Sequence, residues 1–469
     1  MSPPRPVALG AAARRFRVGG SREGRAWAAA LRAQTGVREA WHTETHVAFM
    51  GEAALDAVPS ADLDAGRLHE LPVVFDGPDR EEVARASGLG RGLDAALLEN
   101  ELDVSFVGFA PGFGYLRGLD ARLHLPRRAS PRPRVPTGAL ALAGGFAGVY
   151  PGPTAGGWHL VGRVLVPLVP DGAPLLASGD RIQLVDGRDA TLQEPRAWTD
   201  AEAGLLLAEV RGLAFVQDGG RTGRLHQGMP PSGALLPAAL AWANALVGNP
   251  AGAAGIERYG ALRLRAEGVA LELATDEGRR WRLGPGEELD LDWRASQRAG
   301  YVAVRGGLDV PVVLGGRGTH VRAQLGGHRG RALRRGDVLP VGTLAGGTDA
   351  EAPDFDPEAP IAVVPGPDLE AFAEGSLARL TSTRWRLSHR SDRMGTLLEG
   401  GALAHRPGWE ARSAPLLAGA IEVPPDGVPI VLGPEHPTTG GYPVLGVVDE
   451  LEALLRRPLG GAVRFRLAP

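Results

Sequence analysis

Two acid–base pairs have the residue types and the spacing to bind or activate a ligand. Asp218 and Arg221 lie three residues apart in a glycine-rich turn, where the backbone can approach a ligand closely. Asp392 and Arg393 are adjacent, so in a strand they would point to opposite faces and would not pair with each other. The alternative for both pairs is a polar contact that braces a turn. We predict catalytic roles for all four residues.

Hydroxyl groups and glycines near the C-terminus form a second candidate site. The run TTGGY at 438–442 offers two threonine hydroxyls and a flexible backbone, which suit a carboxylate or phosphate oxygen. The alternative is a β-bulge or a turn capped by a hydroxyl. We predict substrate-binding roles for residues of this run and of two other glycine-rich stretches: Thr438, Thr439, Gly440, Tyr442, Ser232 and Arg317.

The chain contains neither lysine nor cysteine, and all 51 basic residues are arginine. A Schiff-base amine, a P-loop lysine and a lysine-linked biotin are therefore excluded, as are thiolate nucleophiles and disulfides. The 11 histidines include no His-Glu-x-x-His spacing, and we predict no metal site. Phosphate or carboxylate recognition must then depend on arginine, on metal ions or on backbone N–H groups.

The composition indicates a folded protein of several domains. At roughly 150 residues per domain, 469 residues suggest three or four domains. A net charge of −3 gives no reason to expect nucleic acid or an anionic membrane as partner. No apolar run approaches the roughly 20 residues that span a bilayer, and no signal-peptide pattern follows the N-terminal arginines. We expect a cytoplasmic protein.

Short strands outnumber helices in the pattern of apolar residues. Alternating or apolar runs punctuated by Gly and Pro predict strands at 140–142, 181–185, 271–273, 301–304 and 430–432. Helices are expected at 22–34, 80–98, 232–246, 368–380 and 449–455, with Ser232 as a cap. The polar segment 186–203 and the acidic segment 346–360 have the composition of linkers.

Two stretches of the chain repeat each other. The first copy contains VPTG at 135–138, which corresponds to Val423-Pro424 with Gly427 in the second. It also contains GGWHLVGRV at 156–164, which corresponds to GGYPVLGVV at 440–448. Gly-Asp before a strand also recurs, at 179–180 and 336–337. Duplicated β-domains explain this pattern, and chance matching of glycine-rich turns is the alternative.

Ordered motifs in both halves resemble known families. VGFAPGFGYL at 107–116, LPRR at 125–128, RVPTG and the Gly-Gly-Trp block resemble the KipI family, which is the B component of 5-oxoprolinase or allophanate hydrolase subunit 1. VQDGGRTG at 216–223, GMPPSGA at 228–234, VGNP at 247–250, SDRMG at 391–395, GAIEVPPDG at 419–427 and TTGGYP at 438–443 resemble the KipA family, which is the C component or the carboxyltransferase-like module. The resemblance is good from about Glu70 onward and poor before it. Arginines inside these motifs become candidate anion ligands: Arg221, Arg317, Arg393, Arg127, Arg134 and Arg163.

The resemblance implies a mainly β fold, with an α/β N-terminal part and tandem cyclophilin-like β-barrel domains. The expected units are a small α/β domain at 1–70, a B-like cyclophilin-like domain at 71–190, and two C-like barrels at 205–350 and 356–469. Glu422 and Phe146 stand where the families usually have Gln, and Glu435-His436-Pro437 replaces the usual Asp-x-Gln.

By the same resemblance, the chain is expected to be a fused B–C component of an ATP-dependent 5-oxoprolinase. It would open 5-oxo-L-proline to L-glutamate together with a separate A component of the LamB/YcsF family, using ATP with or without Mg²⁺ and no covalently bound biotin. One alternative is a biotin-dependent carboxyltransferase or allophanate hydrolase-like module of urea metabolism. The other is a regulatory protein that binds a sensor kinase. A homo-oligomer is compatible with each.

Overall fold

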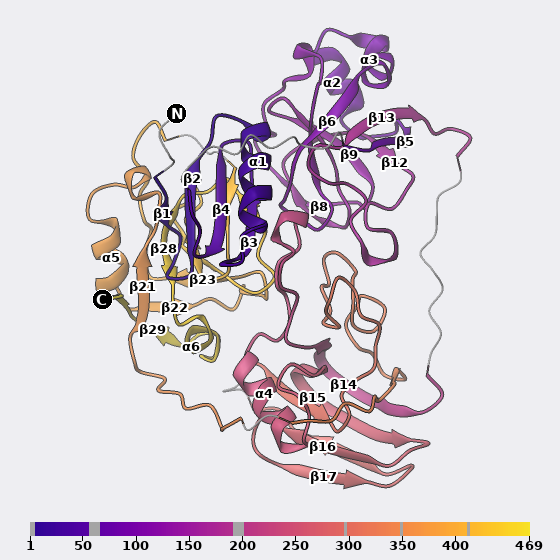
Figure 1. Ribbon diagram of the computed structural model, residues 1–469, viewed down its shortest axis with the longest axis vertical. Coiled ribbons are helices and arrows are strands. Elements are labelled where there is room, and N and C mark those ends of the chain that lie inside the picture. The colour runs from indigo at the N-terminus through magenta and orange to yellow at the C-terminus, as the bar shows by residue number, and fades with distance from the viewer. Residues whose placement is uncertain (1–4, 56–65, 191–200, 295–297, 348–349, 410–412) are drawn as a thin grey trace.

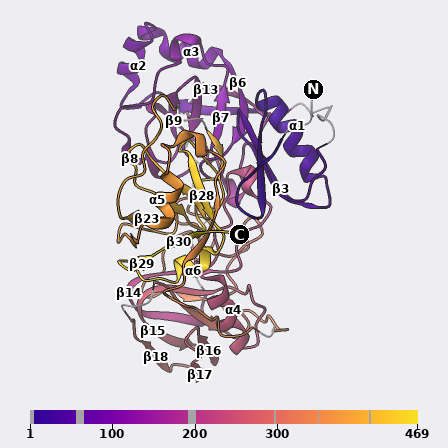
Figure 2. The ribbon, with the colours of Figure 1, turned by 90° about the vertical axis from the view of Figure 1, so that its left-hand side faces the viewer.

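Four large sheets follow one another along the chain in the computed structural model, and two short two-stranded ribbons accompany them (Figures 1 and 2). The structure describes residues 5–55, 66–190, 201–294, 298–347, 350–409 and 413–469. In this part of the chain no helix is both long and apolar enough to cross a membrane.

The N-terminal sheet is four-stranded, in the order β1-β2-β4-β3. Its strands are β1 (Val7–Ala8), β2 (Ala13–Arg17), β3 (Val37–His42) and β4 (His46–Gly51). Helix α1 (Ser21–Arg32) begins one residue before the expected position and buries Trp27 and Leu31 against the sheet. The opposite face packs on the C-terminal part of the chain, since Leu9 and Trp41 share a core with Leu416 and Val447.

A closed barrel follows, in the order β10-β7-β6-β13-β5-β12-β9. Its strands are β5 (Leu68–Val74), β6 (Glu101–Val107), β7 (Gly114–Arg117), β9 (Ala139–Ala143), β10 (Phe146–Val149), β12 (His159–Val164) and β13 (Arg181–Asp186). Only β5 and β13 pair in parallel within it. A two-stranded ribbon of β8 (Arg132–Val135) and β11 (Thr154–Gly156) extends from the barrel, and α2 (Arg80–Ala86) and α3 (Leu93–Glu99) cover one end.

The middle part is an open seven-stranded sheet, whereas a barrel was expected at 205–350. Its strands are β14 (Gly204–Gln217), β15 (Gly255–Glu267), β16 (Leu271–Thr275), β17 (Arg280–Leu283), β18 (Glu288–Leu291), β19 (Gly300–Val304) and β20 (Val338–Leu339). The long β14 and β15 pair with each other along their whole length. In the described structure the edge strands β17 and β20 do not pair with each other, so the sheet is open. Helix α4 (Pro237–Leu246) packs on this sheet.

The C-terminal sheet has eight strands, in the order β29-β22-β23-β26-β25-β28-β21-β30. They are β21 (Ile361–Pro365), β22 (Trp385–Leu387), β23 (Gly395–Glu399), β25 (Ala420–Glu422), β26 (Ile430–Leu432), β28 (Val444–Val448), β29 (Ala462–Val463) and β30 (Phe465–Leu467). A ribbon of β24 (Ala414–Pro415) and β27 (Thr439–Gly440) and the helices α5 (Ser376–Ser382) and α6 (Leu451–Leu455) complete this second barrel. The predicted mainly β chain with tandem barrels and an α/β start is confirmed.

The predicted duplication is confirmed, but part of its register is wrong. The order β7-β10-β9-β12-β5-β13 of the first barrel recurs as β23-β26-β25-β28-β21-β30, and both copies end in a parallel pair. Gly138 before β9 therefore corresponds to Gly419 before β25, and not to Gly427. Both glycines have positive φ, at 79° and 88°. In both, an added Cβ would lie within 3 Å of a carbonyl, Val164 O at 2.7 Å or Val448 O at 2.6 Å.

Glycines with positive φ also explain why two expected helices are shorter or divided. The helix expected at 80–98 breaks between α2 and α3, where Gly88 and Gly90 have φ of 71° and 53°. The one expected at 368–380 begins only at Ser376, after Gly375 with φ 79°. Ser232 does not cap α4, which begins at Pro237. The strands expected at 140–142, 181–185, 271–273, 301–304 and 430–432 are all present.

The expected domain limits need one adjustment. Strand β5 crosses the limit at residue 70 and pairs with β12 and β13 of the barrel, so we propose that the barrel domain begins before Leu68. The end of this domain at 190 and the expected units at 205–350 and 356–469 stay proposals. Most of the expected linker 186–203 lies at 191–200, outside the described residues. No helix or strand occupies the described part of 346–360.

Candidate functional site

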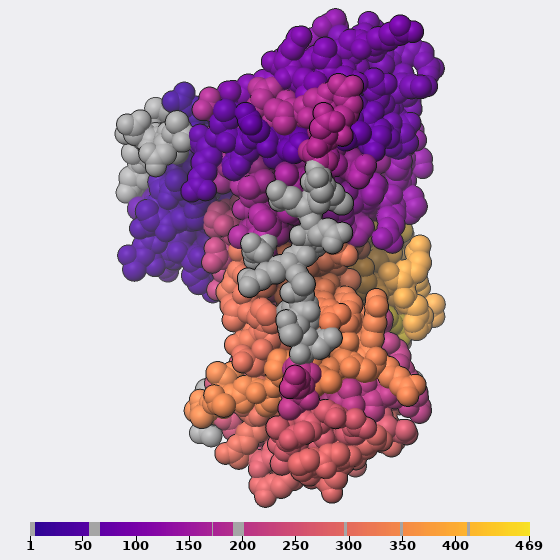
Figure 3. All heavy atoms as spheres, turned by 90° about the vertical axis from the view of Figure 1, so that its right-hand side faces the viewer, coloured from indigo at the N-terminus to yellow at the C-terminus, as the bar shows by residue number. Residues whose placement is uncertain are grey.

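Loops that carry the recognisable motifs meet where the two barrels and the middle sheet join. The Gly112 N–H of the first barrel donates to Gln227 O at 3.1 Å, next to the GMPPSGA run. The Ser232 N–H in that run donates to Pro434 O of the second barrel at 2.9 Å. Figure 3 shows the segment after β19, in orange, between the first barrel and the middle sheet. In this segment the Arg322 backbone lies against Gly152 of the first barrel. Motifs that are far apart in the sequence thus build one region.

A pocket of about 480 Å³ opens between the two barrels, and we call it the inter-barrel pocket. The first barrel contributes most of the aromatic side chains and two arginines, and the second contributes a carboxyl group and residues 439–442 of the TTGGY run. Its lining includes Phe109, Phe113, Tyr115, Arg127, Arg128, Tyr150, Trp158, Ser413, Glu422, Pro437, Thr439, Gly440, Gly441 and Tyr442. The repeated Gly-Gly-aromatic motifs of both barrels therefore face the same space.

The aromatic wall is rigid because its rings pack on one another. The Phe113 ring centroid lies 5.2 Å from that of Tyr150 and 5.6 Å from that of Trp158, each in an edge-on arrangement. Burial raises the pKa of both Tyr115 and Tyr150, so their hydroxyls stay un-ionised in the wall at neutral pH.

A backbone-to-side-chain hydrogen bond links the barrels at the pocket. The Phe109 N–H donates to Thr439 Oγ1 at 2.9 Å. Phe109 has φ of 65°, a left-handed conformation that a bulky residue adopts only when its surroundings hold it there. The neighbouring Gly108 has no side chain because a Cβ there would lie 2.5 Å from Thr439 Oγ1. Thr439, predicted to bind substrate, therefore holds the two barrels together at the pocket wall.

The positive charge of the pocket comes from Arg127. Its neighbour Arg128 pairs with the buried Asp79 at 3.0 Å, and Asp79 also accepts from Arg132. Arg127 is exposed, and it has no hydrogen-bond or ion-pair partner within the described ranges. A cation without a protein partner at the edge of an aromatic pocket is suited to a ligand carboxylate or phosphate.

Among the described residues that line this pocket, Glu422 has the only carboxyl group. Its side chain is 5% exposed, and its Oε1 atom has no hydrogen-bond partner among the described residues. Burial, together with the charge of the nearby Asp368, raises the pKa of Glu422 to about 8. The group is therefore mostly protonated at neutral pH, and it can donate a hydrogen bond to a ligand.

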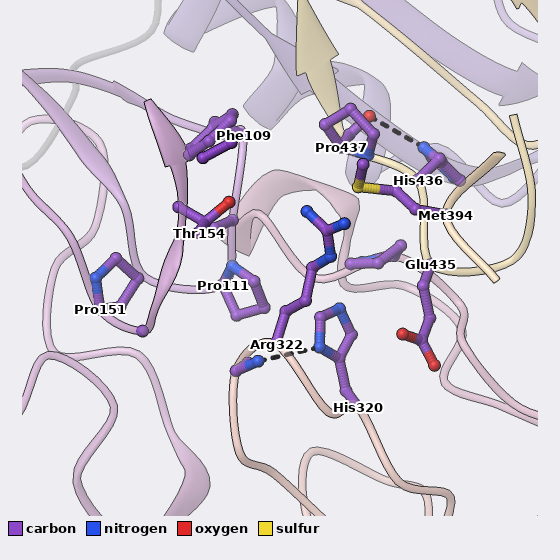
Figure 4. A pocket seen from close by; sticks show the side chains of 15 residues that line it. Phe109, Pro111, Pro151, Thr154, His320, Arg322, Met394, Glu435, His436 and Pro437 are labelled. Atoms are coloured by element: carbon purple, nitrogen blue, oxygen red, sulfur yellow. Dashed lines mark hydrogen bonds between the residues drawn. The ribbon is translucent and has the colours of Figure 1, made fainter. Parts of the chain in front are cut away.

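A smaller cavity of about 150 Å³ adjoins the pocket, sharing Phe109 and Pro437 with it. Figure 4 shows His320, Arg322, Glu435 and His436 around this cavity, with the His320 ring receiving a hydrogen bond from the Ala323 N–H at 3.1 Å. Burial lowers the pKa of His320 and lowers that of His436 to about 4, so both rings are neutral at pH 7. The cavity is of a size for ordered water or a small anion beside Arg322.

Arg393 lies behind the smaller cavity, in a buried cluster of charged and phenolic groups. Its guanidinium contacts Glu257 at 2.5 Å and Glu435 at 2.6 Å, and it donates to Gly233 O. Glu257 is fully buried and also accepts from Tyr259 and Tyr301. Burial disfavours the charge of Arg393, but the two carboxylates outweigh it and raise the pKa of Arg393. Each nitrogen of this guanidinium is thus engaged by a protein group.

A second group of predicted residues holds two loops together. Asp218 and Arg221 lie in one loop, and Arg317 lies in the other. Asp218 accepts from the backbone of Gly220 at 2.9 Å and of Arg317 at 2.5 Å. Arg221 is buried and donates to Val313 O and Gly318 O, and Arg317 pairs with Asp309 at 2.8 Å. These contacts agree with the alternative of braced turns, although Asp218 and Arg221 do not bridge each other. Their catalytic and binding roles stay predictions.

The remaining predicted residues are dispersed. Asp392 is exposed, precedes β23 in a turn and accepts from the Met394 N–H at 2.8 Å. Since the pair does not lie in a strand, the expected opposite orientation does not apply, and Asp392 and Arg393 line one pocket of about 320 Å³. Ser232 is buried with φ of 52°. Thr438 is buried and its carbonyl accepts from the Trp41 side chain. Of the ten predicted residues, the structure brings Thr439, Gly440 and Tyr442 together at the inter-barrel pocket.

The sequence offered a signal for Glu422 that the predicted site did not use. A single carboxyl stands in the apolar run Ala420-Ile421-Glu422-Val423, which the structure makes a fully buried strand. An isolated acid in such a strand indicates an unusual environment. No comparable signal marks Glu257, because β15 carries several other charged residues along its length. In the described part of the chain, no three His, Asp or Glu side chains are grouped to hold a metal ion.

Family comparisons agree with this two-part arrangement. The family described as carboxyltransferase domain, subdomain A and B, matches residues 227–467, and the one described as carboxyltransferase domain, subdomain C and D, matches residues 34–173. The second match begins well before Glu70, so part of the N-terminal sheet belongs to the resemblance.

Known proteins resemble the two halves separately and the chain as a whole. The C component of 5-oxoprolinase from Escherichia coli is 35% identical over 53% of this chain and 86% of its own length. The B component from Bacillus subtilis is 41% identical over 25% of this chain and 52% of its own. The crystal structure of TTHA0988 superposes with a TM-score of 0.81 at 31% identity, covering 97% of this chain and 99% of that one. Urea amidolyase of Lachancea kluyveri is 28% identical over 50% of this chain but 15% of its own length.

Proposed function

Because the chain belongs to the carboxyltransferase-domain family, we propose that it is the joined B and C component of an ATP-dependent 5-oxoprolinase. In this proposal it opens 5-oxo-L-proline to L-glutamate together with a separate A component of the LamB/YcsF family. The similarity of its second half to the C component and of its first half to the B component supports this role.

The inter-barrel pocket is the observation that carries the proposal. Its walls come from both halves, so neither half alone contains the complete pocket. The Phe109–Thr439 hydrogen bond also crosses from one half to the other. A chain that joins B-like and C-like parts keeps both walls at a fixed stoichiometry, as a shared substrate site requires.

The chemistry of the pocket suits a small cyclic amide with a carboxylate. The aromatic wall can cover the ring, Arg127 can pair with the carboxylate, and the un-ionised Glu422 can donate to the single lactam oxygen. The lactam must be activated, which phosphorylation of its oxygen by ATP can supply. Arg317 and Arg393 do not fit an ATP site, since both already pair with carboxylates, and Arg221 is buried against the carbonyls of Val313 and Gly318. We therefore propose that groups of the A component contribute to holding ATP.

A reconstituted reaction tests the proposal. The purified chain, a LamB/YcsF-type A component, ATP, Mg²⁺ and 5-oxo-L-proline are combined, and glutamate is measured. We expect release that requires both proteins and ATP, with either protein alone at background. A complex that forms but yields no glutamate would rule out this function.

Arg127→Met should weaken substrate use selectively. Loss of one charge-assisted hydrogen bond of about 1.5–3 kcal/mol predicts a rise in KM for 5-oxo-L-proline of about 10- to 100-fold. Arg122→Met is the matched control, because Arg122 is exposed in the same region and pairs with Asp120 at 2.6 Å outside the pocket. Equal KM values for the two variants would remove Arg127 from the site.

Carboxyl transfer to a urea-like substrate is the second candidate, favoured by the similarity to urea amidolyase. The chain has no lysine, so the carboxybiotin would have to arrive on a separate carrier protein. Consumption of carboxybiotin in the presence of urea, without glutamate release from 5-oxo-L-proline, would select this function over the first.

A further inference from the structure

The two barrels provide an internal comparison for Glu422. Strand β25 of the second barrel corresponds to β9 of the first. When the two barrels are aligned by their strand pairings, Glu422 is the equivalent of Ala141. Ala141 is buried within the aromatic cluster of the first barrel. The fold therefore accepts a small apolar residue at this position, and a carboxyl group is not needed to build the barrel.

One carboxyl oxygen of Glu422 is buried without a hydrogen-bond partner among the described residues. This oxygen is Oε1, and the side chain is 5% exposed. Gly440 keeps the approach open, since a Cβ there would lie 2.6 Å from Oε1 and 2.5 Å from Leu416 Cδ1. An unsatisfied carboxyl oxygen in a buried wall has a free-energy cost that a ligand hydrogen bond would remove.

No cation neutralises this carboxyl group among the described residues. Asp368 is the charged group that acts on it from the loop after β21, and Asp368 is itself paired with Arg15 of β2. The Tyr442 backbone N–H opposes the effect of Asp368. From the first barrel, the titratable groups lining the same pocket are Arg127, Arg128, Tyr115 and Tyr150. None of these four forms an ion pair or hydrogen bond with Glu422 among the contacts of the described residues.

We propose that Glu422, in its un-ionised form, donates a hydrogen bond to the amide oxygen of the ligand and so determines that the pocket takes a lactam. The proposal depends on the proposed function for the identity of the ligand, and it assigns a specificity-determining role within that site. Arg127 holds the ligand carboxylate, and Glu422 distinguishes a ring that carries an acceptor oxygen from one that does not. Ionised Glu422 would instead face the lactam oxygen and the ligand carboxylate with a negative charge.

Equilibrium binding measures this role without requiring turnover. The full chain, with and without the A component, is titrated with 5-oxo-L-proline and with cyclopentanecarboxylate, which lacks the amide oxygen. For the wild type below pH 8 we expect about five- to tenfold tighter binding of the lactam. Above pH 8 lactam affinity should fall by up to tenfold per pH unit, because the donating form becomes scarce.

Three variants separate the possible outcomes. Glu422→Gln keeps a neutral donor, so it should retain the preference for the lactam and lose the pH dependence. Glu422→Ala, which copies Ala141, should bind both compounds equally. Glu399→Gln, an exposed carboxylate on β23, should behave as the wild type.

The contrary results are equally distinct. A preference that persists in Glu422→Ala, pH-independent binding by the wild type, or no lactam binding with or without the A component would overturn the proposal. Binding with the expected pattern but without ATP-dependent glutamate release would support the role of Glu422 and contradict the proposed reaction.

Discussion

Arg393→Met is expected to destabilise the protein by about 3–5 kcal/mol, the largest effect we predict for a single substitution. The substitution leaves Glu257 and Glu435 buried without their shared cation. It also removes the donor to Gly233 O, which links the second barrel to the middle sheet. Denaturant unfolding followed by tryptophan fluorescence measures the loss.

The pH dependence of this loss has a defined sign. In the wild type, burial raises the pKa of Glu435, but Arg393 outweighs it and the net pKa is below 4.5. Its contribution to stability is therefore present above about pH 4.5 and is lost as the pH falls through the lowered pKa. Without Arg393, burial alone raises the pKa, so the folded state binds a proton more tightly than the unfolded one. The deficit of Arg393→Met should then be smaller at pH 5 than at pH 8.

Arg386→Met is the control for this experiment. Arg386 lies in the same barrel, 65% exposed, with Glu399 at 3.4 Å. Removing an exposed pair of this kind should change stability by about 0–1 kcal/mol. If the two substitutions cost the same, the cluster around Arg393 does not stabilise the junction.

The fold was predictable to the extent that glycine and strand patterns are local. The repeat between the barrels showed in the Gly-Gly-aromatic motifs, which mark the same turn in both. The other end was misaligned because VPTG and VPPDG share letters but lie on opposite sides of their strands. What makes Gly138 and Gly419 equivalent is a carbonyl of a neighbouring strand, at Val164 and Val448, and no local pattern contains that contact.

The site was less predictable because its decisive contacts are distant in sequence. Arg393 looked like a ligand residue in a motif, yet its partners Glu257 and Glu435 are 136 and 42 residues away. A motif shows that a residue type is required, but it does not show whether the side chain faces a ligand or a protein group. Thr439 faces both kinds of group. It lines the pocket, and its hydroxyl oxygen accepts a hydrogen bond from the backbone N–H of Phe109, 330 residues earlier.

That cross-barrel contact supports the second major prediction, a double-mutant cycle between Gly108 and Thr439. Gly108→Ala places a methyl group 2.5 Å from Thr439 Oγ1 and 2.6 Å from Cγ2, so one barrel must move from the other. We expect a loss of about 1–3 kcal/mol in stability and, because a displacement of about 1 Å at a site can cost 100-fold in rate, a drop in glutamate release of that order. Gly92→Ala is the control, since nothing lies within 4 Å of its added Cβ.

The sign of the coupling separates a steric cause from a general loss of stability. Thr439→Ala alone leaves the Phe109 N–H without its acceptor and should cost about 1–3 kcal/mol. In the double variant the methyl group added at Gly108 meets neither Oγ1 nor Cγ2, and the nearest remaining side-chain atom is Cβ at 3.1 Å. The double variant should therefore be more stable and more active than the sum of the single losses predicts, by about 1 kcal/mol. Additive losses would mean that Gly108 and Thr439 act independently, and that the close approach of the barrels at this point does not set the geometry of the pocket.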